Sequence, residues 1–167
     1  MIGCPFKVRG NFSCGDATLS SLEGGPVKVG GAFYCINNKL SSLIGGPTSV
    51  GGDFKCYANW LDNLIGCPLI IGGDFECNRN RLTSLEGCPV EVLGKFNCSN
   101  NRLTSLEICP AKVGGNFECE DNMLTESFLY NFSADQICAY YLNKNLNEKL
   151  IIDFSEEVIT NIRSKKI

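Results

Sequence analysis

GGDFKCYANWLDNL, residues Gly51 to Leu64, contains most of the signals that decide the fold of this 167-residue chain. Its phenylalanine, cysteine, asparagine and leucines recur at a spacing of 21 residues, whereas Tyr57 and Trp60 have no equivalents in the other copies. Trp60 is also the only tryptophan of the protein. We therefore expect the recurring residues to build the fold and the others to be candidates for function.

Six copies of this repeat follow one another, and whole residue classes keep the period. The repeated positions are Phe12, Phe33, Phe54, Phe75, Phe96 and Phe117; Cys14, Cys35, Cys56, Cys77, Cys98 and Cys119; Leu19, Leu40, Leu61, Leu82, Leu103 and Leu124; and Pro5, Pro26, Pro47, Pro68, Pro89 and Pro110. A fixed period of this length indicates a solenoid, in which each unit buries its apolar side chains against its neighbours.

The pattern within one unit is G-x-P-x-x-V-G-G-x-F-x-C-x-x-N-x-L-x-x-L. Alternation in F-x-C predicts a short strand with the phenylalanine and cysteine pointing inward and the intervening residue outward. The asparagine then turns the chain, and we expect its side chain to hydrogen-bond backbone groups in adjacent turns. The two leucines return to the interior, and the Gly-Pro segment suits an extended or turn conformation.

F-x-C-x-x-N-x-L resembles the L-x-L-x-x-N-x-L core of leucine-rich repeats, and the short unit with its proline is similar to their bacterial and bacteriophage type. The resemblance covers roughly Gly3 to Thr125. It implies an α/β repeat solenoid: a right-handed coil with a parallel concave β-sheet and a mostly extended convex side. It implies no activity, because fold and function are separable.

The two ends of the chain depart from the repeat. We expect residues 1–125 to form the solenoid and residues 126–167 to form a helical C-terminal cap, because Ser133 to Gln136 has the form of a capping box and Ser155 can begin a second helix. A separate functional tail is the alternative. At the other end Ala17 replaces the asparagine, and no cap precedes the first unit. That edge is either tolerated or stacks against a second copy or a partner.

Composition narrows the function classes. The net charge of −3 and the pI near 5.0 argue against a nucleic-acid or membrane partner bound by bulk charge. The N-terminus has no apolar run like that of a signal peptide, and no 18-residue apolar span occurs. These features favour a cytoplasmic protein.

The 11 cysteines are odd in number and contain no C-x-x-C spacing, so we expect reduced thiols that pack in the interior. Cys67, Cys88 and Cys109 form a second ladder before three of the prolines. Three stacked thiolates suggest zinc as an alternative, but zinc usually takes four ligands and the chain has no histidine to complete the set. Packing is the favoured interpretation, with no cofactor.

The outward strand positions are where a repeat protein usually binds its ligand. Aromatic residues gather there in the second and third units, a composition typical of a protein-binding hot spot. The predicted partner-binding residues are Tyr34, Ile36, Lys55, Tyr57, Trp60, Arg79 and Arg81. Alternatively, the aromatic rings lie flat on one another or are covered by the C-terminal cap of a neighbouring copy.

Catalysis and nucleic-acid binding are disfavoured. Without histidine, Ser-His and Cys-His nucleophile pairs are excluded. Asp53 and Asp74 should lie side by side, but Lys55 and Glu76 beside them are expected to pair across the strands. A further set of basic residues near Trp60, namely Lys39, Arg81 and Arg102, resembles the pattern of single-strand binders, although acidic neighbours oppose it.

The sequence therefore predicts a non-enzymatic scaffold that binds a protein of unknown identity through its concave face. The resemblance implies a phage or bacterial protein acting on a host factor. The alternative is an assembly subunit, for example of a viral particle, that self-associates through its N-terminal edge.

Overall fold

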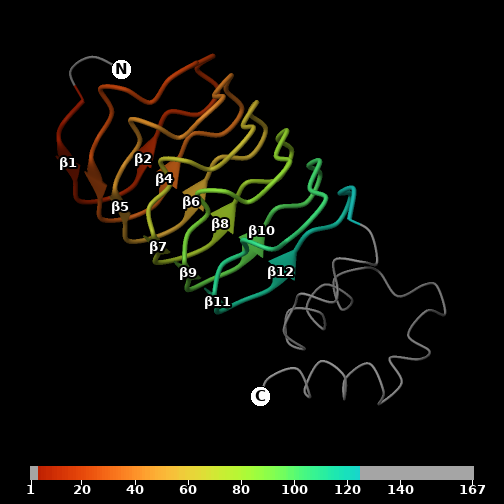
Figure 1. Ribbon diagram of the computed structural model, residues 1–167. Helices are drawn as coiled ribbons and strands as arrows, with labels where there is room; N and C mark the ends of the chain where they lie inside the picture. Colours follow the sequence, from red (N-terminus) through yellow and green to blue (C-terminus); the bar gives the residue numbers. More distant parts are fainter. Residues whose placement is uncertain (1–3, 125–167) are drawn as a thin grey trace, which may run out of the picture.

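The computed structural model describes residues 4–124, which form six coils stacked along one axis (Figure 1). Each coil contributes one two-residue strand to each of two parallel sheets, here called sheet A and sheet B. Sheet A contains β1 (Lys7–Val8), β3 (Lys28–Val29), β5 (Ser49–Val50), β7 (Ile70–Ile71), β9 (Glu91–Val92) and β11 (Lys112–Val113). Sheet B contains β2 (Phe12–Ser13), β4 (Phe33–Tyr34), β6 (Phe54–Lys55), β8 (Phe75–Glu76), β10 (Phe96–Asn97) and β12 (Phe117–Glu118).

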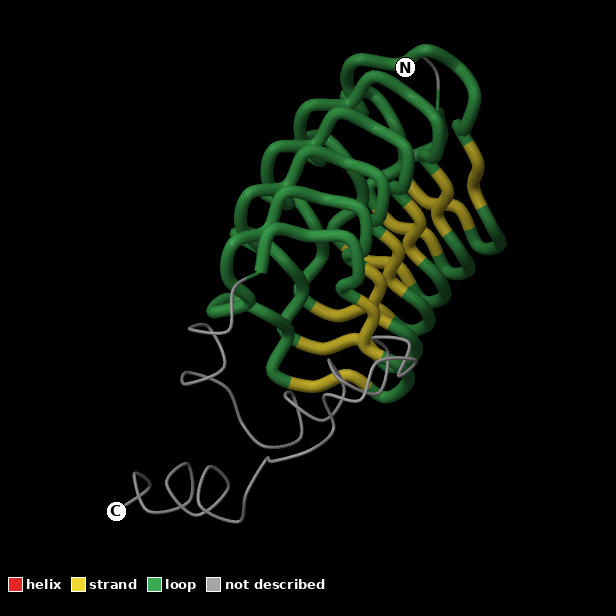
Figure 2. The backbone as a smooth tube through the Cα atoms, turned by 90° about the vertical axis from the view of Figure 1, so that its right-hand side faces the viewer, coloured by secondary structure: helices red, strands yellow, loops and turns green. Residues whose placement is uncertain are grey.

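The strands pair in register with the repeat, so every residue lies beside its equivalent in the next unit. Phe33 pairs with Phe54 in sheet B, and Val29 pairs with Val50 in sheet A. Loops and turns make up the rest of each coil (Figure 2). Because equivalent residues stack on one another, each column of the repeat becomes a ladder along the solenoid.

The interior consists of the apolar ladders that the repeat predicts. Phenylalanine rings of adjacent units lie 5.1 to 5.8 Å apart between centroids, within the range of favourable aromatic pairs. Phe54, Cys56, Leu61 and Leu64 are completely buried, as is Ile71 of sheet A. Burying one such apolar side chain stabilises the fold by about 1.5–3 kcal/mol, so the stacked ladders are the main source of stability.

In units two to six the repeated asparagine hydrogen-bonds the preceding unit as well as its own, which confirms the expectation from sequence. The Asn59 side-chain amide donates to the carbonyl oxygens of Cys35 (2.9 Å) and Cys56 (3.1 Å). Its Oδ1 accepts from the N–H of Leu40 at 3.1 Å. A buried backbone group without a hydrogen-bond partner is energetically costly. The asparagine ladder supplies such partners and thereby joins each turn to the unit before it.

At the corner between the two sheets adjacent coils come close together at the first glycine of V-G-G, a position that Leu93 occupies in the fifth unit. A Cβ placed on Gly51 would lie 2.3 Å from the carbonyl oxygen of Gly30, which belongs to the coil before it. A second turn, after the leucine pair, has Gly45 at a φ of +81°, a conformation that glycine adopts without strain. The V-G-G segment and the turn before the proline are therefore two of the bends of the coil.

The fold-class prediction was wrong. No helix occurs within residues 4–124, and the chain there is a parallel β-solenoid with two sheets, not an α/β solenoid with one sheet and an extended far side. The Lys-Val and Ser-Val pairs before the glycines form sheet A, and the segment from a strand of sheet B to the next strand of sheet A, such as residues 35–48, consists of turns, bends and irregular structure. Gly45 at positive φ and Pro47 interrupt any helix there. The predicted helical cap, residues 126–167, lies outside the described residues, and the domain boundary at residue 125 stays a prediction.

Candidate protein-binding face

Tyr34 and Lys55 lie side by side on the outward face of sheet B, because β4 and β6 pair in register. The Lys55 ammonium lies 5.9 Å from the centre of the Tyr34 ring, a cation–π distance, and both side chains are half-buried. The structure thus brings these two predicted residues together.

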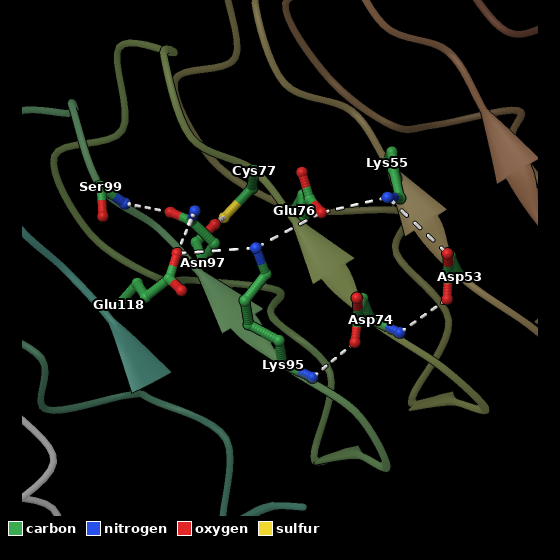
Figure 3. A network of polar contacts seen from close by, with 9 residues as sticks. All are labelled: Asp53, Lys55, Asp74, Glu76, Cys77, Lys95, Asn97, Ser99 and Glu118. Carbon is green, nitrogen blue, oxygen red and sulfur yellow. Dashed lines mark hydrogen bonds and ion pairs between the residues drawn. The ribbon is translucent and has the colours of Figure 1, made fainter. Parts of the chain in front are cut away.

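Lys55 also begins a network of ion pairs along sheet B (Figure 3). Its Nζ lies 3.1 Å from Glu76 and 3.7 Å from Asp53, which confirms the predicted pairing of Lys55 with Glu76 across the strands. Lys95 continues the network, with its Nζ 3.6 Å from both Glu76 and Glu118. Positive and negative groups alternate in this network, and its three carboxylates outnumber its two ammonium groups by one.

This network sets the pKa of Lys55. Burial by itself lowers the pKa of the amine, but the hydrogen bond and charge of Glu76, with the charges of Asp53, outweigh burial and leave the pKa raised. Lys55 therefore stays protonated and paired at neutral pH.

Asp53 and Asp74 have a structural role that the sequence reasoning missed. The N–H of Asp74 donates to Oδ1 of Asp53 at 3.0 Å, and the N–H of Lys95 donates to Oδ1 of Asp74 at 2.8 Å (Figure 3). Asn11 accepts from the N–H of Ala32 in the same way. The signal was present as the recurrence of Asn or Asp before the phenylalanine, since these side chains commonly accept from backbone N–H groups.

Trp60 lies in the turn that follows the sheet B strand, and 44% of it is exposed. The Lys39 ammonium is 5.7 Å and the Arg81 guanidinium 4.9 Å from the centre of its ring. Lys39 belongs to the unit before Trp60 and Arg81 to the unit after it, so the two cations approach the ring from opposite sides.

Ile36 and Tyr57 are half-buried beside sheet B. Ile36 fills the space over Gly15, since a Cβ on that glycine would lie 2.8 Å from Cγ1 of Ile36. Arg79 is exposed in the turn before Arg81, with a φ of +55° that is unusual for a residue other than glycine, asparagine or aspartate.

The predicted site is therefore two neighbouring groups. Tyr34, Ile36, Lys55 and Tyr57 lie on or beside sheet B, whereas Trp60, Arg79 and Arg81 lie in the turn. Within residues 4–124 no hydrogen bond, ion pair or ring contact joins one group to the other.

The cysteines form the predicted ladder, and those of residues 4–124 carry no disulfide. Burial raises the pKa of Cys35, Cys56 and Cys98 well above the ordinary value, and raises the pKa of Cys14 in the first unit to about 11. Thiols of raised pKa are poor nucleophiles and poor metal ligands at neutral pH, because both roles need the thiolate.

Neither a metal site nor a membrane span is found in this part of the chain. No group of three or more Cys, Asp or Glu side chains in the described range is arranged to hold a metal ion, and Cys88 of the second ladder donates to the carbonyl oxygen of Ile108. No helix long and apolar enough to cross a membrane lies within residues 4–124.

Comparison with known proteins found no significant match. No protein-family model matches this chain, and no curated protein or solved structure matches it significantly.

Proposed function

We propose that this chain is a non-enzymatic scaffold that binds another protein through sheet B and the turn that follows it. The observation that carries the proposal is Trp60, which is 44% exposed, whereas the phenylalanine of the F-x-C stretch is buried in units two to six. The ladder of backbone and ring contacts keeps the surrounding surface rigid, so binding would cost little conformational entropy.

The residues divide the work by their chemistry. Tyr34, Tyr57 and Trp60 would supply apolar contact area at low entropic cost, with Ile36 beside them. Lys55 would contribute little net charge because Glu76 and Asp53 already neutralise it, whereas Arg79 and Arg81 have no carboxylate partner within the described residues.

We also propose that the chain is related to the leucine-rich repeats of bacteria and bacteriophages and acts in the cytoplasm of a bacterial cell, on a host protein. The F-x-C-x-x-N-x-L stretch supports the relationship, and the buried cysteines without disulfides support a reducing compartment.

An affinity capture from bacterial lysate tests the proposal. The wild-type chain is compared with Tyr57→Ala/Trp60→Ala and with a matched control, Ile44→Ala/Ile65→Ala, which removes two exposed apolar side chains from a different turn. We expect one protein to be captured by the wild type and the control and lost with Tyr57→Ala/Trp60→Ala. Equal capture by all three chains would show that the aromatic residues are not the binding site.

A second candidate function rests on the N-terminal edge. Val8, Phe12, Cys14 and Leu19 are only half-buried, although their equivalents in the next unit are buried. This apolar edge, where β1 and β2 are the outermost strands of the two sheets among the described residues, favours an assembly subunit that stacks on another copy or on a partner particle. Light scattering over a concentration series tests the self-associating form, and a monomer at every concentration would rule that form out.

A further inference from the structure

The turn after the cysteine has a row of exposed residues on four successive units. This basic row consists of Lys39, Trp60, Arg81 and Arg102. Each backbone N–H of the row donates to a carbonyl oxygen of the unit before it, at 2.8 Å for Lys39, 3.0 Å for Trp60 and Arg81, and 2.8 Å for Arg102. The spacing of the row is therefore fixed by the solenoid, at about 4.8 Å per unit.

The cations of the basic row have no acidic partner within residues 4–124, in contrast to those of sheet B. Lys55 and Lys95 each contact two carboxylates, but no ion pair involves Arg81 or Arg102, which lie on adjacent units. Like charges side by side repel one another, so a bound anion would relieve this repulsion.

Lys7 and Lys28 lie side by side on adjacent strands of sheet A, and neither forms an ion pair within the described residues. No aromatic ring within the described residues lies under either ammonium, and both are lysines, whose compact charge cannot bind a carboxylate by two parallel hydrogen bonds. Lys7 and Lys28 therefore provide similar charge, but they have neither an aromatic ring beside them nor the planar guanidinium donors of the basic row.

The position of Trp60 selects the kind of anion. The Lys39 ammonium and the Arg81 guanidinium lie 5.7 Å and 4.9 Å from the centre of its ring, so these cations would compete with a nucleic-acid base for stacking on the ring, which is how single strands are bound. A guanidinium stacked on a ring keeps its N–H donors free at the edge, where a carboxylate can accept from two of them.

The ends of the row limit the length of the ligand. In the equivalent turns the first unit carries Asp16 and the last described unit carries Asp121, both exposed. A long polyanion that continued along the solenoid would meet these carboxylates, whereas a short acidic segment would not.

We propose that the basic row binds a short acidic segment of the partner protein, with its Asp or Glu carboxylates accepting from Arg81, Arg102 and Lys39. This inference rests on the proposed protein-binding function and specifies the chemistry of the partner. Arg79, two residues before Arg81 and also unpaired, extends the same positive surface.

Fluorescence anisotropy with a short labelled poly-glutamate peptide tests this at low ionic strength, where exposed charges are least screened. Arg81→Gln/Arg102→Gln is expected to weaken binding about fivefold for each charge removed. Lys7→Gln/Lys28→Gln removes the same charge from adjacent units of sheet A, and binding should change less than about twofold. All the positions are exposed, and circular dichroism and thermal melting check that each variant keeps its fold.

Three results would overturn the inference: no binding of poly-glutamate to the wild type, equal weakening by the two double variants, or tighter binding of a labelled oligo-dT strand that is lost with Arg81→Gln/Arg102→Gln. The last result would identify single-stranded nucleic acid as the ligand. If poly-glutamate fails while Tyr57→Ala/Trp60→Ala still loses a captured protein, the proposed function stands and only the acidic segment is wrong.

Discussion

The first unit and the interior units share one sequence pattern but differ in burial. Phe12 of the first unit is half-buried, whereas Phe54, with a unit on either side, has no exposed surface. Leu19 and Leu61 differ in the same way. The same residue in the same local conformation thus gains its burial from the neighbouring units, as expected of a solenoid.

The first unit also differs in having Ala17 at the position of the repeated asparagine. Oδ1 of Asn38 accepts from the N–H groups of Ala17 and Leu19, and its amide donates to the carbonyl oxygen of Cys14. Each asparagine therefore supplies hydrogen-bond partners to backbone groups of the unit before it. Among the described residues no coil precedes the unit of Ala17, so an asparagine at this position would lack these partners within residues 4–124.

The largest effect should come from the phenylalanine ladder. Phe54→Ala leaves a cavity between two units and should lower the free energy of unfolding by about 3–5 kcal/mol. Phe12→Ala, at the half-buried end, should cost about half as much. Urea unfolding followed by circular dichroism measures both. Equal losses would show that burial by two neighbours is not what distinguishes the units.

The asparagine ladder comes next. Asn59→Ala removes the hydrogen-bond partners of Leu40, Cys35 and Cys56 and should destabilise the fold by about 2–3 kcal/mol. The matched control is Ala17→Asn in the first unit, for which we expect a change within about 0.5 kcal/mol. A gain from Ala17→Asn as large as the loss from Asn59→Ala would contradict the directional role of the ladder.

The cysteine ladder should make stability fall at alkaline pH. Folded thiols have a raised pKa, so they stay protonated in the native state while unfolded thiols ionise near 9.0. Stability is thus complete below about pH 9 and is lost as the pH rises, by up to about 1.4 kcal/mol per pH unit for each fully buried thiol.

For Cys14, whose pKa is raised to about 11, the loss should end near pH 11, whereas for Cys35 it should continue beyond. Urea unfolding midpoints measure this difference. They are compared for the wild type, Cys14→Ala and Cys35→Ala from pH 7 upward, to a pH above 11. A stability that does not change above pH 9 would refute it.

The smallest effect concerns backbone strain in an interior unit. Ala58 has a φ of +55°, so Ala58→Gly should stabilise the fold by about 1 kcal/mol. Ala111 has no positive φ, and Ala111→Gly should instead destabilise by a few tenths to about 1 kcal/mol. Thermal melting compares the two, and the same sign for both would rule out strain as the cause.

The site was predictable in part. The outward columns follow from alternation around Phe and Cys, so Tyr34, Lys55 and Trp60 could be named as surface residues, and the pairing of Lys55 with Glu76 followed from the register. The contact of Lys39 and Arg81 with opposite sides of Trp60 could not be predicted, because it depends on how far long side chains reach across units.

The sequence by itself determined the length of the unit and the inward ladders, because these depend only on residue type at a fixed spacing. Only the tertiary structure decided the second sheet, because a two-residue strand such as Lys28–Val29 has too little alternation to be recognised and is stabilised by pairing with its equivalents in other units. The tertiary structure likewise decided which cations are neutralised, because that depends on distances between side chains of neighbouring coils.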